Sequence, residues 1–311
     1  MDSIRWITAA KVAVVAGKGG VGKTTLTAAL ARAAADAGRS VLVVGVDGRP
    51  GLAELLGGEA LDYEPQVIDP GGTGRGPISG RIIRPEAALL DYLDDHGLRR
   101  VAKRFLATGA VDVLATTTPG IRDLLVLGKV KQLEQQGVAD LILVDAPAAG
   151  HAITFLHAAR SISEVVAGGR VRQQADDVLE LLSDPARCQV ILVTLPEETP
   201  VNEVVEVAFE LEDRVGIKLG PVVVNGCWPD LDAAPLAVPA DLLDETSPRH
   251  LRETAALAAT RLERQREQLR RLSDTLPLPQ VLLPFRFTAG LTPADLDALA
   301  ASLRIEPVPT P

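Results

Sequence analysis

Residues 17–25 decide the fold of this chain, and they read Gly17-Lys18-Gly19-Gly20-Val21-Gly22-Lys23-Thr24-Thr25. They fit the phosphate-loop pattern GxxxxGK[ST], and Lys18 adds a second lysine at the second position of the pattern. An apolar run over residues 12–16 precedes the loop, and residues 26–37 after it are rich in helix-forming residues. The motif therefore has the strand, loop and helix order of a phosphate-binding site.

In this order each part of the loop has a chemical task. The glycines let successive backbone N–H groups face the β- and γ-phosphates of a nucleotide, and the helix N-terminus adds its dipole. Lys23 neutralises charge on the terminal phosphate, and the hydroxyl of Thr24 is a candidate ligand for Mg²⁺. The sequence thus predicts a nucleoside-triphosphate site.

The composition favours a large α/β protein with no nucleic-acid partner. The chain has 311 residues, of which 47% are apolar but only 3% are aromatic. The core must therefore be built from Ala, Val, Leu and Ile, which suits a parallel sheet flanked by helices. The net charge of −9 disfavours broad electrostatic attraction to nucleic acid.

Cysteine usage and the N-terminus indicate a cytoplasmic protein. Cys188 and Cys227 form no CxxC pair, which argues against a disulfide framework and against a self-contained zinc site. The first ten residues carry an acidic residue at position 2 and few apolar residues, so we expect no signal peptide. No stretch reaches the ~18 to 20 uninterrupted apolar residues of a membrane span.

Further apolar runs predict the other strands of the sheet. They are residues 40–46, 139–145, 189–195, 221–225 and 280–285. Residues 69–80 are rich in glycine and proline and are predicted to form a surface loop, and residues 78–83 are a candidate edge strand. We expect a doubly wound, mostly parallel α/β sheet of the P-loop NTPase type, in a single domain over residues 1–311.

Helical periodicity dominates three segments, namely residues 86–106, 121–136 and 152–182. No strand separates the first two, so we expect a helical insertion over about residues 85–137 and 152–185. The alternative that these helices only cover the sheet stays open. A C-terminal helix is predicted to start with Thr292 as its N-cap and Pro293 at its first position.

Polar residues follow three of the predicted strands. Asp47 and Asp145 each end a strand, and the carboxyl ends of strands are where an open α/β sheet places its ligands. Asp145 has the form of a Walker B acid that holds the magnesium shell, and the small residues after it make a tight strand exit near the γ-phosphate. Asn225 ends the strand over residues 221–225 and has two open roles, reading adenine or capping the strand turn.

These residues resemble one family. The loop over residues 18–25 looks like the deviant Walker A loop of the MinD/ParA/ArsA group of P-loop ATPases, and Asp145-Ala-Pro-Ala-Ala-Gly-His151 is similar to the DTAPTGH segment of the ArsA branch. That branch includes the ATPase for guided entry of tail-anchored proteins. Further segments follow the order of the branch or look like paired actinobacterial ArsA-like ATPases: residues 46–51, 85–94, 118–123, 195–197, 224–225 and 283–285. The resemblance covers residues 11–303 and implies ATP and Mg²⁺.

The resemblance also implies roles for single residues. Lys18 is the signature lysine, which reaches across a face-to-face dimer to the phosphates of the partner. Asp47 matches the first switch aspartate, which orients or deprotonates the attacking water, while Asp145 and His151 belong to the second switch segment. The implied ATP-binding residues are the phosphate loop from Gly19 to Thr25 and the positions Glu197, Asn225 and Pro284.

The implied function is an ATP-hydrolysing, dimeric, cytoplasmic switch that binds and releases an apolar client or a membrane partner. Its partner would be a second copy or a paralogous ATPase. Two alternatives stay open: an energising subunit of an arsenite or anion efflux pump, and a slowly hydrolysing regulatory half of a heterodimer.

Three departures from the family pattern bear on these alternatives. Residues 47–50 read Asp-Gly-Arg-Pro where the family has Asp-Pro-Ala-His, which affects the coupling of the first switch to hydrolysis. The chain has no CxxC zinc clasp, and Met1 is its only methionine. A methionine-rich client groove is therefore not expected.

Overall fold

The structure is a computed structural model that describes residues 6–46, 51–95, 97–98, 100, 120–147, 150–229 and 249–303, with the backbone alone for residues 150–152 and 250–252. Its centre is an eight-stranded sheet of strand order β3-β4-β2-β5-β1-β6-β7-β8. Seven strands run parallel, and β3 (Gln66–Asp69) pairs antiparallel with β4. The parallel strands are β1 (Val12–Gly17), β2 (Val41–Val46), β4 (Ile78–Ile83), β5 (Leu141–Asp145), β6 (Cys188–Thr194), β7 (Leu219–Cys227) and β8 (Gln280–Pro284).

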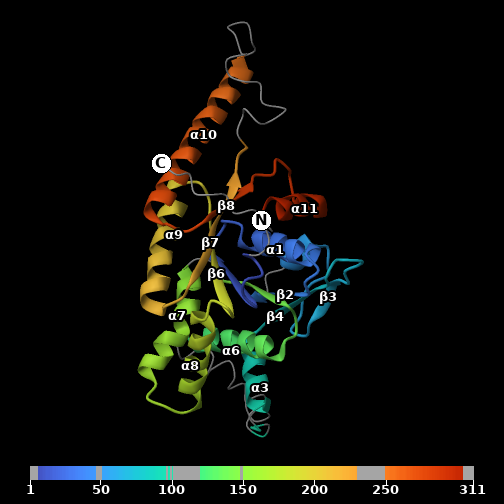
Figure 1. The fold of residues 1–311 in the computed structure, drawn as a ribbon, viewed down its shortest axis with the longest axis vertical. Helices are drawn as coiled ribbons and strands as arrows, with labels where there is room; N and C mark the ends of the chain where they lie inside the picture. Colours follow the sequence, from blue (N-terminus) through green and yellow to red (C-terminus); the bar gives the residue numbers. More distant parts are fainter. Residues whose placement is uncertain are drawn as a thin grey trace.

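Helices cover both faces of this sheet (Figure 1). One face packs against α1 (Lys23–Asp36), α2 (Leu52–Leu56) and α11 (Pro293–Ser302). The other face packs against α6 (Ile121–Gln136), α7 (Gly150–Val165), α8 (Arg170–Ser183), α9 (Glu198–Glu210) and the π-helix η1 (Leu211–Val215). The fold is thus a doubly wound, mostly parallel α/β sheet, as the apolar runs predict.

The two helical layers explain why the strands are apolar throughout. Successive side chains of a strand point to opposite faces of a sheet, so Val12 and Val14 join one core while Ala13 and Val15 join the other. All six residues of β1 are buried. A strand covered on both sides has no polar face to display, which is why no alternation shows in the sequence.

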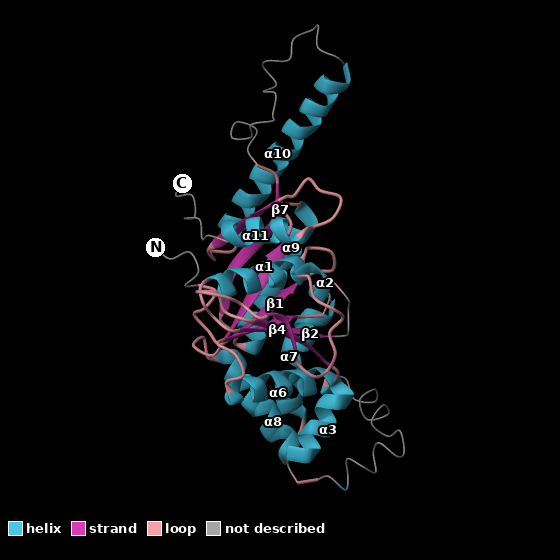
Figure 2. Cartoon of the chain, turned by 90° about the vertical axis from the view of Figure 1, so that its right-hand side faces the viewer, coloured by secondary structure: helices cyan, strands magenta, loops and turns pink. Residues whose placement is uncertain are grey.

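The molecule is elongated, with helices at both ends (Figures 1 and 2). At one end, α3 (Pro85–Asp95), α6 and α8 lie together, and α7 packs against α6 and α8. At the opposite end, α10 (Arg249–Thr275) projects beyond the sheet. Within the described ranges, no helix is both long enough and apolar enough to cross a membrane.

One strand and one helix differ from what the sequence predicts. Residues 78–83 do form a strand, but β3 pairs outside it, so β4 is not the edge. The short helix α2 was also not predicted. Both missed elements have only four or five residues, and β3 is partly exposed, so neither produces a periodic pattern that a sequence reading detects.

A glycine and a capping residue mark the starts of α8 and α11. The helical run over residues 152–182 is interrupted between α7 and α8, and Gly169 precedes α8 with φ 86°. Thr292 caps α11 in a capping box with Asp295, and Pro293 is the first helical residue. The predicted helix over residues 86–106 ends as α3 at Asp95, and residues 101–106 lie outside the described ranges.

Candidate functional site

The phosphate loop joins the carboxyl end of β1 to the N-terminus of α1, at the edge where an open α/β sheet binds its ligands. A cavity of about 220 Å³ opens beside it. Three neighbouring strands of the sheet contribute to this cavity, because the ends of β2 and β5 lie next to the loop that follows β1. Among the lining residues are Gly22, Lys23, Thr24, Val46 and Asp145.

Lys23 is folded into the loop. Its ammonium donates hydrogen bonds to the carbonyl oxygens of Gly17 and Lys18, both at 3.0 Å, and the residue is only 7% exposed. The positive charge is therefore held at the centre of the turn and beside the cavity. A phosphate that enters the cavity meets this ammonium together with the helix N-terminus of α1.

Thr24 and Asp145 bring two oxygen ligands together. The Thr24 hydroxyl donates to Oδ2 of Asp145 over 2.7 Å, which joins the first turn of α1 to the end of β5. Hydroxyl and carboxylate oxygens suit a hard cation, so the pair fits Mg²⁺. Among the described residues, no group of three or more His, Cys, Asp or Glu side chains could hold a metal ion. Mg²⁺ in nucleotide sites uses few protein ligands, with waters and phosphates supplying the others.

Asn225 braces the loop from the end of β7. Its side-chain nitrogen donates to the carbonyl oxygen of Val21 over 2.8 Å. Gly22 lies directly against this amide: a Cβ atom on Gly22 would be 2.1 Å from the Asn225 nitrogen, and the glycine has φ 93°. A side chain at position 22 would thus be strained and would also displace Asn225. This contact between two distant segments is not visible in the sequence.

Lys18 lies on the other side of the loop. Its side chain is 47% exposed, does not line the 220 Å³ cavity, and pairs with the carboxylate of Glu203 on α9. Lys18 and Glu203 line a second cavity of about 300 Å³, between the loop, α7 and α9. Glu203 is one of several acidic residues on α9, and no local pattern in the sequence distinguishes it from the others.

Two of the predicted ATP-binding positions, Asn225 and Pro284, lie on neighbouring strands. Pro284 ends β8 and is paired in register with Cys227, two residues after Asn225 on β7. Glu197 is the N-cap residue of α9, and its carboxylate lies 3.6 Å from the guanidinium of Arg261 on α10. The fold thus brings Pro284 close to Asn225, whereas the ion-pair partner of Glu197 comes from α10.

An aromatic cluster follows β7 and β8 at this edge. Trp228, Phe285 and Phe287 pack with ring centroids 4.9 to 6.2 Å apart, and Arg261 lies over the Trp228 ring at 4.9 Å. Phe287 is 63% exposed. No local pattern marks this cluster, because its members follow two strands that are distant in the chain.

Both predicted switch segments are described only in part. Asp47 and residues 48–50 lie outside the described ranges, as do Thr118 and Pro119. His151 lies in the first turn of α7, where the structure describes the backbone alone. The roles of Asp47 and His151 therefore stay predictions.

The two cysteines lie far apart. Cys188 begins β6 and is fully buried, which raises the pKa of its thiol to about 12. Cys227 ends the neighbouring parallel strand β7. Because Val190 of β6 pairs with Leu219 of β7, Cys227 lies about ten residues beyond Cys188 along the strand direction. At ~3.3 Å per residue the two sulfur atoms are roughly 30 Å apart. One chain therefore cannot bind a single ion through both thiols.

Comparison with known proteins shows which family this sequence matches. The family model described as anion-transporting ATPase matches residues 10–169. The ATPase BagA of Mycobacterium tuberculosis is 36% identical over 234 residues, which cover 72% of this chain and 68% of the relative. An arsenical pump-driving ATPase of Escherichia coli is 28% identical over a match that covers 67% of this chain and 33% of the relative. The ATPase get3 of Neurospora crassa is 28% identical over a match that covers 66% of this chain and 56% of the relative.

Proposed function

Because the chain belongs to the anion-transporting ATPase family and is an ATP-hydrolysing enzyme, we propose that it is a dimeric switch in which each chain completes the active site of the other. The two chains would be identical copies or paralogues. The proposal places the enzyme in the cytoplasm, where ATP is supplied.

The two lysines of the phosphate loop lie in different places, and this observation supports the proposal most directly. Lys23 is buried beside the phosphate cavity, whereas Lys18 lies outside that cavity with its side chain half-exposed. A lysine directed toward the surface beside α9 would exchange its ion pair with Glu203 for the phosphates of a second chain that packs on this surface. Such an arrangement makes hydrolysis depend on assembly, because the partner supplies the extra positive charge.

The remaining residues have complementary tasks in this mechanism. The N–H groups from Gly19 to Thr25 bind the phosphates, and Lys23 neutralises the charge that develops on the transferred group. Thr24 and Asp145 would hold Mg²⁺, which when bound neutralises charge on the β- and γ-phosphates. Asp47 would orient the attacking water. Asn225 keeps the loop in the shape that binds phosphate.

We further propose that hydrolysis controls the helices at one end of the molecule. Asp145 ends β5, and the chain continues from it to α7, which packs against α6 and α8. A change in the phosphate site that moves the segment after Asp145 would therefore shift this layer. The proposal treats the segment over residues 85–137 and 152–185 as a helical insertion that binds and releases a client.

Mixing two inactive variants tests whether the site is shared. Lys18→Ala lacks the donated lysine, and Thr24→Ala lacks the magnesium ligand, so each should hydrolyse ATP at a background rate. An equal mixture should recover about a quarter of the wild-type rate, because half of the dimers are mixed and each mixed dimer has one complete site. Lys218→Ala, which removes an exposed lysine elsewhere, is the control and should match the wild type.

Phosphate release is the measurement, and each chain is first checked for a native unfolding transition. A mixture that only averages the two separate rates would show that Lys18 acts within its own chain or not at all. A Lys18→Ala variant with the wild-type rate would also contradict the proposal.

A further inference from the structure

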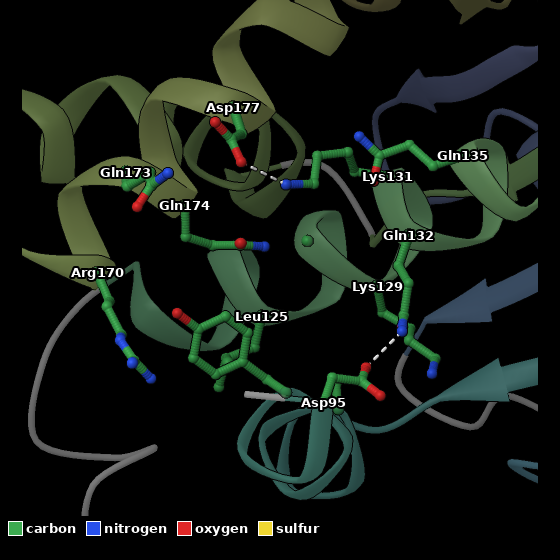
Figure 3. A pocket seen from close by; sticks show the side chains of 13 residues that line it. Asp95, Leu125, Lys129, Lys131, Gln132, Gln135, Arg170, Gln173, Gln174 and Asp177 are labelled. Atoms are coloured by element: carbon green, nitrogen blue, oxygen red, sulfur yellow. Dashed lines mark hydrogen bonds and ion pairs between the residues drawn. The ribbon is translucent and has the colours of Figure 1, made fainter. Parts of the chain in front are cut away.

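A separate cavity of about 550 Å³ lies among α3, α6 and α8, at the end of the molecule that the proposed function assigns to the client (Figure 3). None of its lining residues belongs to the phosphate loop. Its volume is in the range of sites that enclose an organic ligand. Polar side chains dominate the lining, and they include the four carboxamides of Gln132, Gln135, Gln173 and Gln174.

Most charges in the wall are neutralised within the chain. Lys131 pairs with Asp177 over 2.7 Å, and Lys129 pairs with Asp91. Asp91 also accepts a hydrogen bond from the Tyr63 hydroxyl, and the guanidinium of Arg81 on β4 lies over the Tyr63 ring. Lys129 is therefore part of a polar network that extends to β4. These pairs form walls with little net charge.

Two lining charges have no ion pair among the described residues, Asp95 and Arg170, and Asp95 accepts a hydrogen bond from Gln132. Arg170 is the first residue of α8 and makes no ion pair or hydrogen bond within the described part of the chain. Burial raises the pKa of Tyr92, another lining residue, and the positive charge of Arg170 offsets part of this rise. Figure 3 shows the Arg170 side chain on the same side of the cavity as Gln173 and Gln174. A guanidinium without a partner binds a carboxylate well, because its planar N–H groups match the two oxygens.

The carboxamides offer both donors and acceptors. Gln132 donates to Asp95, whereas the side chains of Gln135, Gln173 and Gln174 make no hydrogen bond within the described residues. The Gln174 amide reaches across α6, and this depends on Gly128, because a Cβ there would be 2.1 Å from the Gln174 nitrogen. A carboxamide has the same donor and acceptor groups as a peptide bond.

We propose that this cavity binds a short hydrophilic peptide segment, with its carboxylate on Arg170 and its backbone amides on the glutamines of α6 and α8. The assignment deepens the proposed function, since it names the chemical class that the helical layer takes. An apolar helix would leave Arg170 and three carboxamides desolvated without partners, which disfavours it. The peptide also explains why amide groups lie on two facing helices.

Calorimetric titration of the full chain without nucleotide tests the site. The probe is the tetrapeptide Gly-Gln-Ser-Gly with a free C-terminal carboxylate. We expect saturable binding to the wild type, weaker by about tenfold for Arg170→Ala and for the C-terminally amidated peptide. Gly128→Ala, which moves only the flexible end of Gln174, should also weaken binding. Arg249→Ala, which removes an exposed arginine of α10 at the opposite end of the molecule, should not.

Four results would overturn the assignment. The first three are no saturable binding of the tetrapeptide, equal binding to the wild type and Arg170→Ala, and tighter binding of an alanine and leucine tetrapeptide. Acetate that binds as tightly as the tetrapeptide would reduce the site to an anion site and would also overturn it. Since the titration contains no ATP, its failure is distinct from a failure of the subunit-mixing experiment.

Discussion

The side-chain nitrogen of Asn225 lies 2.8 Å from the carbonyl oxygen of Val21, so the end of β7 holds the phosphate loop in place. Gly22, the next residue, has no side chain that would push the amide away. The shape of the phosphate loop therefore depends on a contact between segments about 200 residues apart in the chain. This relationship leads to the first prediction.

Gly22→Ala should destabilise the chain through two effects, the collision with Asn225 and the left-handed backbone at φ 93°. In an Asn225→Ala background the collision is absent, so the loss should fall to the backbone cost of about 1–2 kcal/mol. Gly20→Ala is the matched control, because Gly20 has φ 85° but no neighbouring atom within 4 Å of its Cβ position. Its cost should be the same in both backgrounds.

Urea unfolding of the six chains, which are the two backgrounds each with the wild-type loop, Gly22→Ala or Gly20→Ala, measures these differences as double-mutant cycles. An equal loss for Gly22→Ala with and without Asn225 would mean that the amide moves aside freely. In that case the contact would not brace the loop.

Thr24→Ala and Asp145→Asn should each lower ATP turnover by about 10²-fold or more while the fold is kept, because the first removes the hydroxyl oxygen and the second the carboxylate charge of a 2.7 Å pair that fits Mg²⁺. The Mg²⁺ concentration for half-maximal turnover should also rise in whichever variant retains measurable activity. Thr260→Ala, on an exposed part of α10, is the control. If the magnesium dependence of an active variant matched the wild type, the pair would have no role in metal binding.

Acid should destabilise the C-terminal helix through Asp295. Hydrogen bonds from the Thr292 hydroxyl and backbone, together with Arg286, lower the pKa of Asp295 to about 2 from an ordinary value of 3.8. A carboxyl with a depressed folded-state pKa stabilises the fold above its unfolded pKa, so this contribution is present above about pH 4 and is lost as the pH falls toward 2.

Asp295→Asn should therefore be less stable than the wild type at pH 7, with a difference that shrinks between pH 4 and 2. Asp297→Asn is the comparison, since that side chain lies on the same helix but is 60% exposed. Unfolding measured at pH 7, 5 and 3 checks both variants. A difference for Asp295→Asn that does not change with pH would contradict the proposed cause.

Arsenite should leave ATP turnover unchanged, because Cys188 and Cys227 lie at opposite ends of neighbouring strands. Burial raises the pKa of Cys188 to about 12, so at pH 8 its thiol stays protonated and should resist maleimide until the chain is unfolded. Turnover that rises with arsenite and is lost in Cys227→Ser would instead support the pump alternative.

Local pattern predicted much of this molecule. The phosphate loop, the apolar strands and the capping box at Thr292 depend on residues within a few positions of each other. Such features follow from backbone preferences and burial periodicity, which are properties of short segments. The strand β3 and the helix α2 were missed because they are too short for periodicity and depend on neighbours for their stability.

By itself the sequence determined that a phosphate-loop motif follows the first strand and that both faces of the sheet are covered, because glycine spacing and apolar runs are local facts. Only the tertiary structure decided that Asn225 braces the phosphate loop, that Lys18 turns to Glu203 rather than into the cavity beside Lys23, and that glutamines of α6 and α8 line one cavity. These are contacts between distant segments, and the packing of helices on the sheet decides which side chains meet.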